Sequence, residues 1–122
     1  MTIAISDDHR TLSETASDFL AKREARGAAR FLLDAEHEKL PGFWRDLVAL
    51  GWVGLHLPEE HGGSGFGLEE LVVVVEALGR AVTPGRFVPT VIASATLSAV
   101  ADDETKAKYL TGLADGSRFG AV

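Results

Sequence analysis

Apolar residues recur at helical spacing along most of this chain. The first such stretch follows Ser6, a favourable N-cap residue, and two aspartates that suit the first turn of a helix. Its apolar side is formed by Leu12, Ala16, Phe19 and Leu20. This pattern predicts a helix that runs to about Gly27. Residues 28–40 show no clear stripe, and we expect a partly helical connection there.

The middle of the chain predicts a short helix and then a very apolar one. Pro41 suits a helix start, and the apolar residues of 43–50 precede Gly51, a typical C-terminal stop. Residues 68–82 contain four consecutive valines, which favour a strand on local propensity alone. The length of the segment, its early glutamates and its late arginine favour a helix instead. Because nearly every side of it is apolar, we expect it to be the buried central helix.

Two further helices complete the pattern. The stretch from Phe87 to Val100 is free of charged residues, and Asp102 or Asp103 can cap a fifth helix that ends between Gly112 and Gly116. Residues 118–122 then resemble the start of a β-strand. The predicted fold is all-α, an antiparallel bundle of about five helices with the start of a strand at its C-terminal end.

Composition narrows the possible functions. A chain of 122 residues suits one domain, and its net charge of −6 is spread along its length. No basic cluster could neutralise a run of phosphates, so we expect no nucleic-acid partner. No apolar run approaches the roughly 18–20 residues that a membrane span needs. The absence of cysteine excludes disulfides and thiolate metal sites, and the default expectation is a cytoplasmic protein.

Residues 51–67 contain six of the thirteen glycines and lie between two predicted helices. A strand, a glycine-rich turn and a helix in this order would imitate a dinucleotide-binding turn. The glycine spacing does not fit G-x-G-x-x-G, no Lys-Ser or Lys-Thr pair follows, and flanking glutamates would repel phosphate. We interpret the segment as a tight connection whose glycines supply positive φ angles and close approach.

No catalytic or metal-binding group of residues is evident elsewhere. The four histidines show no metal-ligand spacing, and the Glu36-His37-Glu38 triplet is best explained as a solvated charged turn. A nucleophile elbow is not matched by Gly63-Ser64-Gly65. The residues alone therefore predict a helical bundle without an evident active site.

Taken whole, the chain resembles the N-terminal helical domain of the acyl-CoA dehydrogenases. The resemblance lies in four ordered motifs: Leu50-Gly51-Trp52-Val53-Gly54-Leu55, Pro58-Glu59-Glu60-His61-Gly62-Gly63-Ser64-Gly65, Glu76-Ala77-Leu78-Gly79-Arg80, and Thr105-Lys106-Ala107-Lys108-Tyr109-Leu110. The family usually has Tyr where His61 stands. These motifs span about the last two thirds of the chain.

This resemblance implies a flavoprotein oxidoreductase of fatty acid or lipid metabolism. Such enzymes carry out α,β-dehydrogenation of an acyl-CoA thioester, pass hydride to FAD and deliver electrons to an electron-transfer flavoprotein. The family's glutamate base and most of its flavin contacts lie in two later domains. We therefore expect residues 1–117 to be the N-terminal α-helical domain and 118–122 the start of a truncated β-domain. No catalytic or cofactor-binding residue is expected in this fragment, which should be inactive and free of FAD.

In the family, the helix after the central one lines part of the acyl pocket. The corresponding residues here are Phe87, Val88, Val91, Ile92 and Ala95, although they could equally be ordinary core residues. The parent protein is expected to form a homo- or hetero-oligomer. An alternative is a non-catalytic assembly or binding module, such as the flavin-less half of a paired or heteromeric dehydrogenase.

Overall fold

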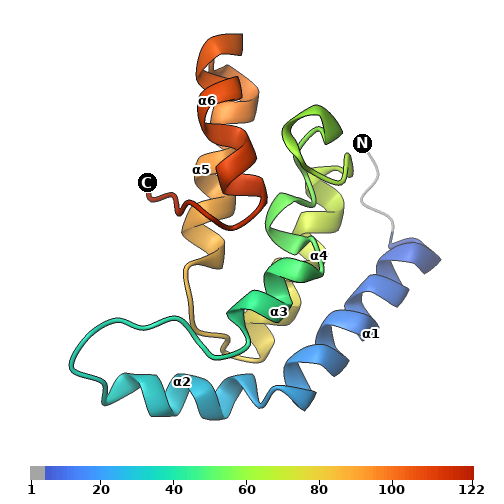
Figure 1. The fold of residues 1–122 in the computed structure, drawn as a ribbon. Coiled ribbons are helices and arrows are strands. Elements are labelled where there is room, and N and C mark those ends of the chain that lie inside the picture. Colours follow the sequence, from blue (N-terminus) through green and yellow to red (C-terminus); the bar gives the residue numbers. More distant parts are fainter. Residues whose placement is uncertain (1–4) are drawn as a thin grey trace.

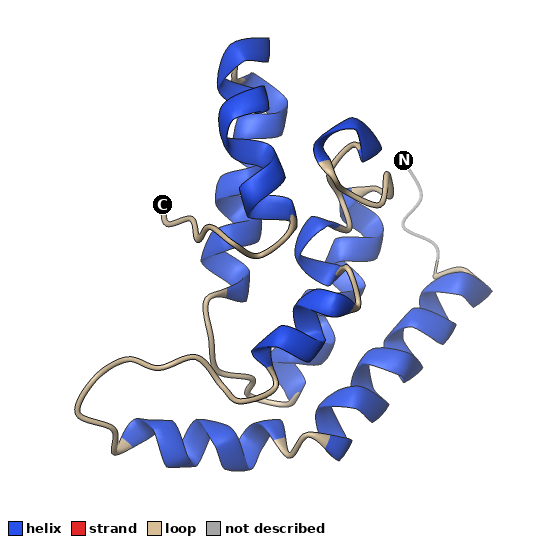
Figure 2. Ribbon diagram, in the orientation of Figure 1, coloured by secondary structure: helices blue, strands red, loops and turns tan. Residues whose placement is uncertain are grey.

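The computed structural model describes residues 5–122, and the regular secondary structure of this part consists of helices joined by loops (Figures 1 and 2). The described part contains no strand, so the all-α prediction is confirmed. None of its helices combines the length and apolar character that crossing a membrane requires. Its elements are α1 (Asp7–Lys22), α2 (Ala25–Leu33), α3 (Trp44–Ala49), the 3-10 turns η1 (Trp52–Gly54) and η2 (Glu59–His61), α4 (Leu68–Arg80), α5 (Phe87–Val100) and α6 (Asp103–Ala114).

Two helix starts follow directly from local sequence. The side chain of Ser6 accepts a hydrogen bond from the backbone N–H of His9 at 3.1 Å, which caps α1. Asp102 caps α6 in the same way, because its carboxylate accepts the N–H of Thr105 at 2.8 Å. Hydrogen bonds from the side chain and backbone of Thr105 lower the pKa of Asp102. Both predicted N-caps are confirmed.

The predicted first helix is wrong beyond Lys22. Glu24 adopts a left-handed conformation, with φ of 51°, and the chain turns there into a separate helix, α2. Gly27, the predicted stop, lies inside α2, and residues 28–33 are helical. Because of this turn, Ala25 is buried in the core cluster. Residues 5–122 therefore contain six α-helices where we expected about five.

The core lies where α1, α3 and α4 meet the first turns of α5. Leu20, Leu47, Trp52 and Val74 are all buried in this cluster. The ring of Phe19 makes edge-on contacts with the rings of Phe43 and Trp52. A second, smaller cluster beneath α6 contains Leu57, Leu110, Leu113 and Ala114. In Figure 1, α5 and α6 form one pair and α1 lies along α4 on the other side of the molecule.

Helix α4 is less buried than its composition predicts. Leu71, Val74 and Leu78 are buried against the core, but Leu68 and Val72 are exposed on the opposite side. The expectation that this helix is covered on nearly every side is therefore wrong for this chain. With only two layers of helices in the described part, one side of each helix is left facing outward.

The C-terminal residues do not form the predicted strand. In the described residues no second strand offers ladder hydrogen bonds, and 118–122 cross α5 as an irregular tail. The N–H of Gly120 donates to Thr90 Oγ1 at 3.2 Å, and the Phe119 ring packs on Trp44 at 5.8 Å between centroids. A Cβ on Gly120 would overlap the side chain of Ala93, so this crossing requires glycine.

Candidate functional site

Helix α5 carries all five residues predicted from the sequence, and the structure separates them onto two sides. Phe87 and Val91 point into the core and expose only 4% and 2% of their surface. One helical turn separates them, which places both on the same side of α5. These two residues close the domain's own interior, as the alternative interpretation of the five residues anticipated.

The other three predicted residues face outward. Val88 and Ile92 expose 42% and 47% of their surface, and Ala95 is half-buried. Because they follow one another at spacings of four and three, they form one continuous strip along α5, here called the outer strip. The structure therefore leaves an uncharged apolar surface of three residues where the sequence suggested a pocket wall of five.

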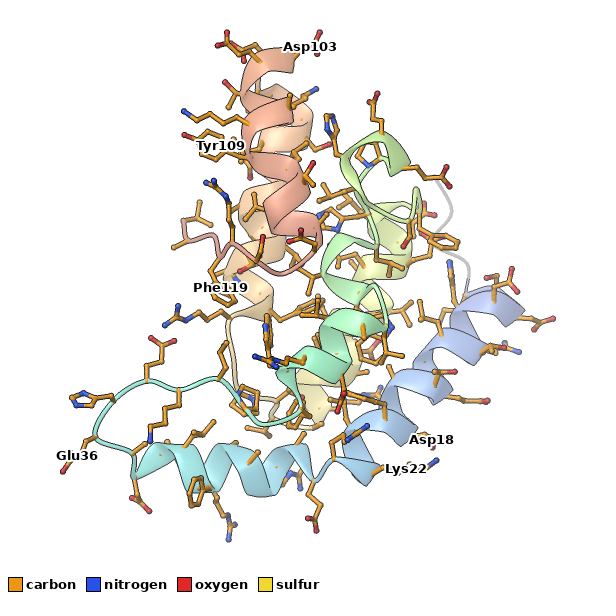
Figure 3. The ribbon with its side chains drawn as sticks, viewed as in Figure 1. Asp18, Lys22, Glu36, Asp103, Tyr109 and Phe119 are labelled. Atoms are coloured by element: carbon orange, nitrogen blue, oxygen red, sulfur yellow. The ribbon has the colours of Figure 1, made fainter. Side chains whose placement is uncertain are left out.

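A third side of α5 was missed by the sequence analysis. Ala93 and Leu97 line a groove of about 420 Å³ that lies between α5, α6 and the tail. Tyr109 of α6 and Phe119 of the tail both lie on this side of the molecule (Figure 3). The guanidinium of Arg118 lies 5.6 Å from the Tyr109 ring. No local pattern indicates this groove, because it depends on where the tail crosses the helix.

The glycine-rich segment meets α5 through a partly buried polar pair, His56 and Ser94. His56 Nε2 lies 2.9 Å from Ser94 Oγ, and Ser94 is completely buried. The Ser94 hydroxyl donates its proton to the carbonyl oxygen of Val91 at 3.1 Å. With the serine proton directed to Val91, the serine oxygen accepts from His56 Nε2–H, and the proton of the neutral ring is then on that nitrogen. His56 Nδ1 is buried without a hydrogen-bond partner among the described residues.

This His-Ser pair is structural and does not form an activated nucleophile. A general base must accept the serine proton, whereas here the imidazole donates and the hydroxyl is directed to a carbonyl. Burial lowers the pKa of His56 below its ordinary value of 6.5, and a protonated ring would leave a buried N–H at Nδ1 without an acceptor. The pair connects the loop to the middle of α5.

The backbone donors of the glycine run are bonded within the glycine-rich loop. Five successive N–H groups, from Gly62 to Phe66, donate to carbonyl oxygens of residues 54–59 at 2.9–3.0 Å. The φ angles of Gly51, Gly62 and Gly65 are positive, between 74° and 85°, as the sequence predicted. A Cβ on Gly63 would overlap the backbone of Leu57. The interpretation of this segment as a tight structural connection is confirmed.

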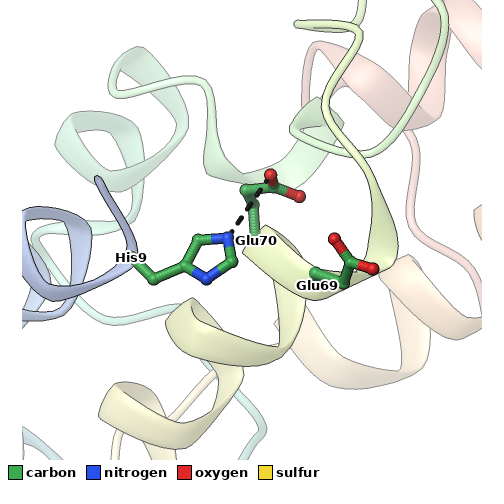
Figure 4. Close-up of side chains that lie close together, drawn as sticks. All are labelled: His9, Glu69 and Glu70. Carbon is green, nitrogen blue, oxygen red and sulfur yellow. Dashed lines mark ion pairs between the residues drawn. The ribbon is translucent and has the colours of Figure 1, made fainter. Parts of the chain in front are cut away.

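One group of possible metal ligands lies where α1 begins beside α4. Ligand atoms of His9, Glu69 and Glu70 all lie within 4.8 Å of one another (Figure 4). Glu70 accepts the N–H of Gly67 at 3.0 Å, and His9 Nε2 lies 3.5 Å from its carboxylate. Hydrogen bonds from its own N–H and from that of Gly67 lower the pKa of Glu70. His9 Nδ1 faces the N–H of Ser6, so the group serves to cap α1 and α4.

The Glu36-His37-Glu38 triplet is exposed, as predicted for a solvated turn. Glu36 lies at the outer edge of the connection between α2 and α3 (Figure 3). Glu38 forms an ion pair with Arg86 at 3.0 Å, which ties this connection to the start of α5. The guanidinium of Arg86 also lies 5.0 Å from the Phe119 ring.

Comparison with known proteins identifies relatives over almost the whole chain. Residues 6–117 match the model of the acyl-CoA dehydrogenase N-terminal domain. The chain is 34% identical to acyl-CoA dehydrogenase IpdE2 of Mycobacterium tuberculosis, over 95% of this chain and 36% of that protein. It is 31% identical to the mitochondrial isovaleryl-CoA dehydrogenase of Pongo abelii, over 97% of this chain and 29% of that protein.

Solved structures agree with these relatives. A variant of the Tcur3481-Tcur3483 steroid ACAD matches 95% of this chain with a TM-score of 0.81 and 29% identity, over 32% of its own chain. The ChsE4-ChsE5 complex from Mycobacterium tuberculosis has the same fold, with a TM-score of 0.83 at 22% identity over 98% of this chain and 33% of its own. The chain spans about a third of the length of these relatives. It belongs to the acyl-CoA dehydrogenase family, whose N-terminal helical domain it forms.

Proposed function

We propose that this domain serves an FAD-dependent acyl-CoA dehydrogenase and that the outer strip of α5 forms part of its acyl pocket. The observation that carries this proposal is the exposure of Val88 and Ile92 on a helix without any charged residue. An acyl group needs an apolar wall that the domain's own core does not already use. Phe87 and Val91 lie under this wall and hold the helix in place.

The strip suits a substrate that is apolar along its length. Burying an exposed valine or isoleucine side chain stabilises a complex by about 25 cal/mol for each Å² of apolar surface removed from water. Ala95 is small and leaves room at the end of the strip for a thicker group, such as a ring system. The strip offers no acid, base or nucleophile, so its proposed contribution is to bind and orient the acyl group.

The described residues do not fit FAD on their own. A dinucleotide cofactor needs free backbone N–H groups at its pyrophosphate, whereas five successive N–H groups of the glycine-rich loop, from Gly62 to Phe66, are bonded within the loop. No redox step is therefore assigned to this chain. In an acyl-CoA dehydrogenase the flavin supplies the hydride acceptor, and we propose that residues outside this domain hold it and the glutamate base.

The domain limits and partners belong to the same proposal. We place the helical domain at residues 1–117, of which 1–4 lie outside the described residues, and the start of a β-domain at 118–122. An electron-transfer flavoprotein would reoxidise the parent enzyme, which we expect to be an oligomer. A cytoplasmic location stays a prediction from composition.

The test introduces bulk into the outer strip of the complete polypeptide that carries this domain. With Ile92→Trp we expect kcat/KM for long or ring-bearing acyl-CoA thioesters to fall about tenfold or more relative to a short thioester. The matched control is Val72→Trp, at an exposed valine of α4 outside the strip. If both variants changed kcat/KM equally for all substrates, the assignment of the outer strip to the acyl pocket would be wrong.

The isolated 122-residue chain provides a second check. It should reduce no dye when mixed with acyl-CoA thioesters, because neither the base nor the flavin site is expected in it. Robust turnover by this chain would overturn the proposal that the flavin and the glutamate base are held by residues outside this domain. A hydrophobic dye should bind the exposed strip, and a strictly monomeric chain that binds no dye would count against it.

A second candidate is supported by one relative. The solved structure with 29% identity is described as the Tcur3481-Tcur3483 steroid ACAD, a name that joins two components. This domain could then belong to the half of a paired dehydrogenase that lacks a flavin site and serves assembly. The two candidates differ in flavin content, so the absorbance spectrum of the complete polypeptide, purified without a partner, distinguishes them. A bound flavin with the ordinary yellow spectrum favours the catalytic candidate.

A further inference from the structure

Two buried hydroxyl groups lie one helical turn apart on α5. Among the described residues, Thr90 and Ser94 are the two polar side chains that are completely buried. In the outer strip, Val88 precedes Thr90 by two residues and Ile92 precedes Ser94 by two. Since a helix turns about 100° per residue, an offset of two residues corresponds to about 200°. The two hydroxyls therefore lie on the side of α5 opposite Val88 and Ile92.

Each hydroxyl is bonded to a segment that is distant in the sequence. The backbone N–H of Gly120, 30 residues along the chain, donates to Thr90 Oγ1 at 3.2 Å. His56, 38 residues from Ser94, places its Nε2 at 2.9 Å from Ser94 Oγ. Gly120 belongs to the tail that crosses α5 (Figure 1), and His56 belongs to the glycine-rich segment. Two separate parts of the molecule thus hold α5 at two successive turns.

These bonds are directional, whereas the other contacts of α5 are not. The helix has no charged residue, so no ion pair orients it. Phe87 and Val91 enter the core, but burial of apolar surface does not favour one direction. A rotation of about 30° would move each Cα by about 1.2 Å, because Cα atoms lie about 2.3 Å from the axis, and would move a side-chain oxygen further. A hydrogen bond weakens steeply when its atoms are displaced in this way.

A third hydroxyl on α5 has only a local bond and provides a contrast. Thr96 is exposed, and its hydroxyl donates to the carbonyl oxygen of Ile92 on the same helix at 2.8 Å. This is the bond to a preceding carbonyl that threonine commonly forms within a helix. It turns with the helix and so cannot fix the rotation of α5 relative to the rest of the domain.

We infer that Thr90 and Ser94 are positioning residues that set the rotation of α5 and thereby aim the outer strip. The N–H of Gly120 and the His56 ring are the fixed points to which they are bonded. Neither hydroxyl touches the acyl group, and both act through the side chains on the far side of the helix. The effect on the rotation follows from the hydrogen bonds, and its consequence for substrate choice rests on the proposed acyl pocket.

The first experiment measures the rotation in the 122-residue chain without any substrate. A soluble paramagnetic agent broadens the methyl signals of exposed side chains, so Val88 and Ile92 should be broadened more than Val91. In the variant Thr90→Val with Ser94→Ala, we expect this difference to shrink at least about twofold. Thr96→Val is the matched control and should leave it unchanged. An unchanged difference in the double variant, with helix content retained by circular dichroism, would overturn the inference.

Single variants keep the test decisive if the double variant does not fold. Thr90→Val keeps the shape of the side chain and removes the acceptor, whereas Thr90→Ser keeps the acceptor and loses a methyl group. We expect Thr90→Val to reduce the difference in methyl broadening and Thr90→Ser to preserve it. The opposite order would show that packing, and not the bond to Gly120, orients the helix.

The second experiment measures substrate choice by the complete polypeptide that carries this domain. For Thr90→Val with Ser94→Ala, the ratio of kcat/KM between a ring-bearing and a short acyl-CoA thioester should change at least about threefold, mainly through KM. Thr90→Ser should preserve the ratio, and so should Thr111→Val, at an exposed threonine of α6. A merely structural role would lower kcat/KM for both substrates by the same factor and leave the ratio unchanged.

The two experiments separate this inference from the proposed function. If the methyl exposure changes but the substrate ratio does not, α5 rotates as inferred and the outer strip is not the acyl wall. If Ile92→Trp changes the ratio while the double variant changes neither exposure nor ratio, the pocket stands and the positioning role is wrong.

Discussion

In the glycine-rich segment 51–67 and in helix α5, the sequence and the structure suggest opposite things about function. The segment contains histidines, glutamates and glycines that suggest chemistry, yet the backbone N–H groups of Gly62 to Phe66 are bonded within it and its side chains support packing. Helix α5 has no charged residue, yet the structure gives it three distinct sides: one in the core, one exposed as the outer strip, and one in the groove beside α6. A residue's chemical character therefore indicates less about function in this domain than the direction in which the fold points it.

The largest expected effect tests how tightly the loop is closed. Gly63→Ala places a methyl group on the backbone of Leu57, so we expect a loss of about 3 kcal/mol in the free energy of unfolding. Urea unfolding followed by circular dichroism measures this loss. Gly42→Ala is the control, because nothing lies within 4 Å of its Cβ position, and it should change stability by less than about 0.5 kcal/mol. Similar losses of unfolding free energy in both variants would show that the loop backbone can shift to accommodate the added methyl group.

The next effect separates the sides of α5. Val91→Ala leaves a cavity in the core and should lower the free energy of unfolding by about 2 kcal/mol. Ile92→Ala removes a larger side chain from the outer strip and should cost less than about 0.5 kcal/mol in the same assay. A reversed order would mean that the outer strip is buried in solution, for example by self-association.

The smallest effect lies at the junction of the two regions and depends on pH. Since burial lowers the pKa of His56 in the folded chain below 6.5, the unfolded chain binds a proton there first as the pH falls. Stability is therefore fully present above about pH 6.5 and declines below it, by at most about 1.4 kcal/mol per pH unit, until the folded-state pKa is reached.

A variant isolates this contribution from the other titrating groups. His56→Gln keeps a side-chain N–H for Ser94 but does not titrate, so its stability should fall less between pH 7 and 5 than that of the unchanged chain. Urea unfolding at a series of pH values makes the comparison. His37→Gln, at an exposed histidine, is the control and should follow the unchanged chain. If the unfolding free energy of all three proteins changed with pH in the same way, His56 would not be the source of the predicted pH dependence.

The candidate site was only partly predictable. The resemblance predicted five acyl-facing residues within the segment 87–100, and the structure has a helix with these bounds. Which of the five residues point outward depends on how α5 is rotated against α6 and η1. Periodicity could not determine this rotation, because α5 has no charged residue and its hydroxyl residues Thr90 and Ser94 are buried in the domain instead of facing solvent. The same weakness explains why α4 was expected to be covered on nearly every side.

The sequence by itself determined the helices whose signals act over a few residues. Ser6 and Asp102 cap the helices that follow them. Residues 68–80 are helical despite the strand propensity of their valines, because the length of the segment and the charges in its first and last turns favour a helix. Only the tertiary structure decided the bend at Glu24, the path of the tail and the groove beside α6. These rest on contacts between distant residues, such as Arg26 with Arg80, His56 with Ser94 and Gly120 with Thr90. Such pairs form only after the helices pack, so no local pattern encodes them.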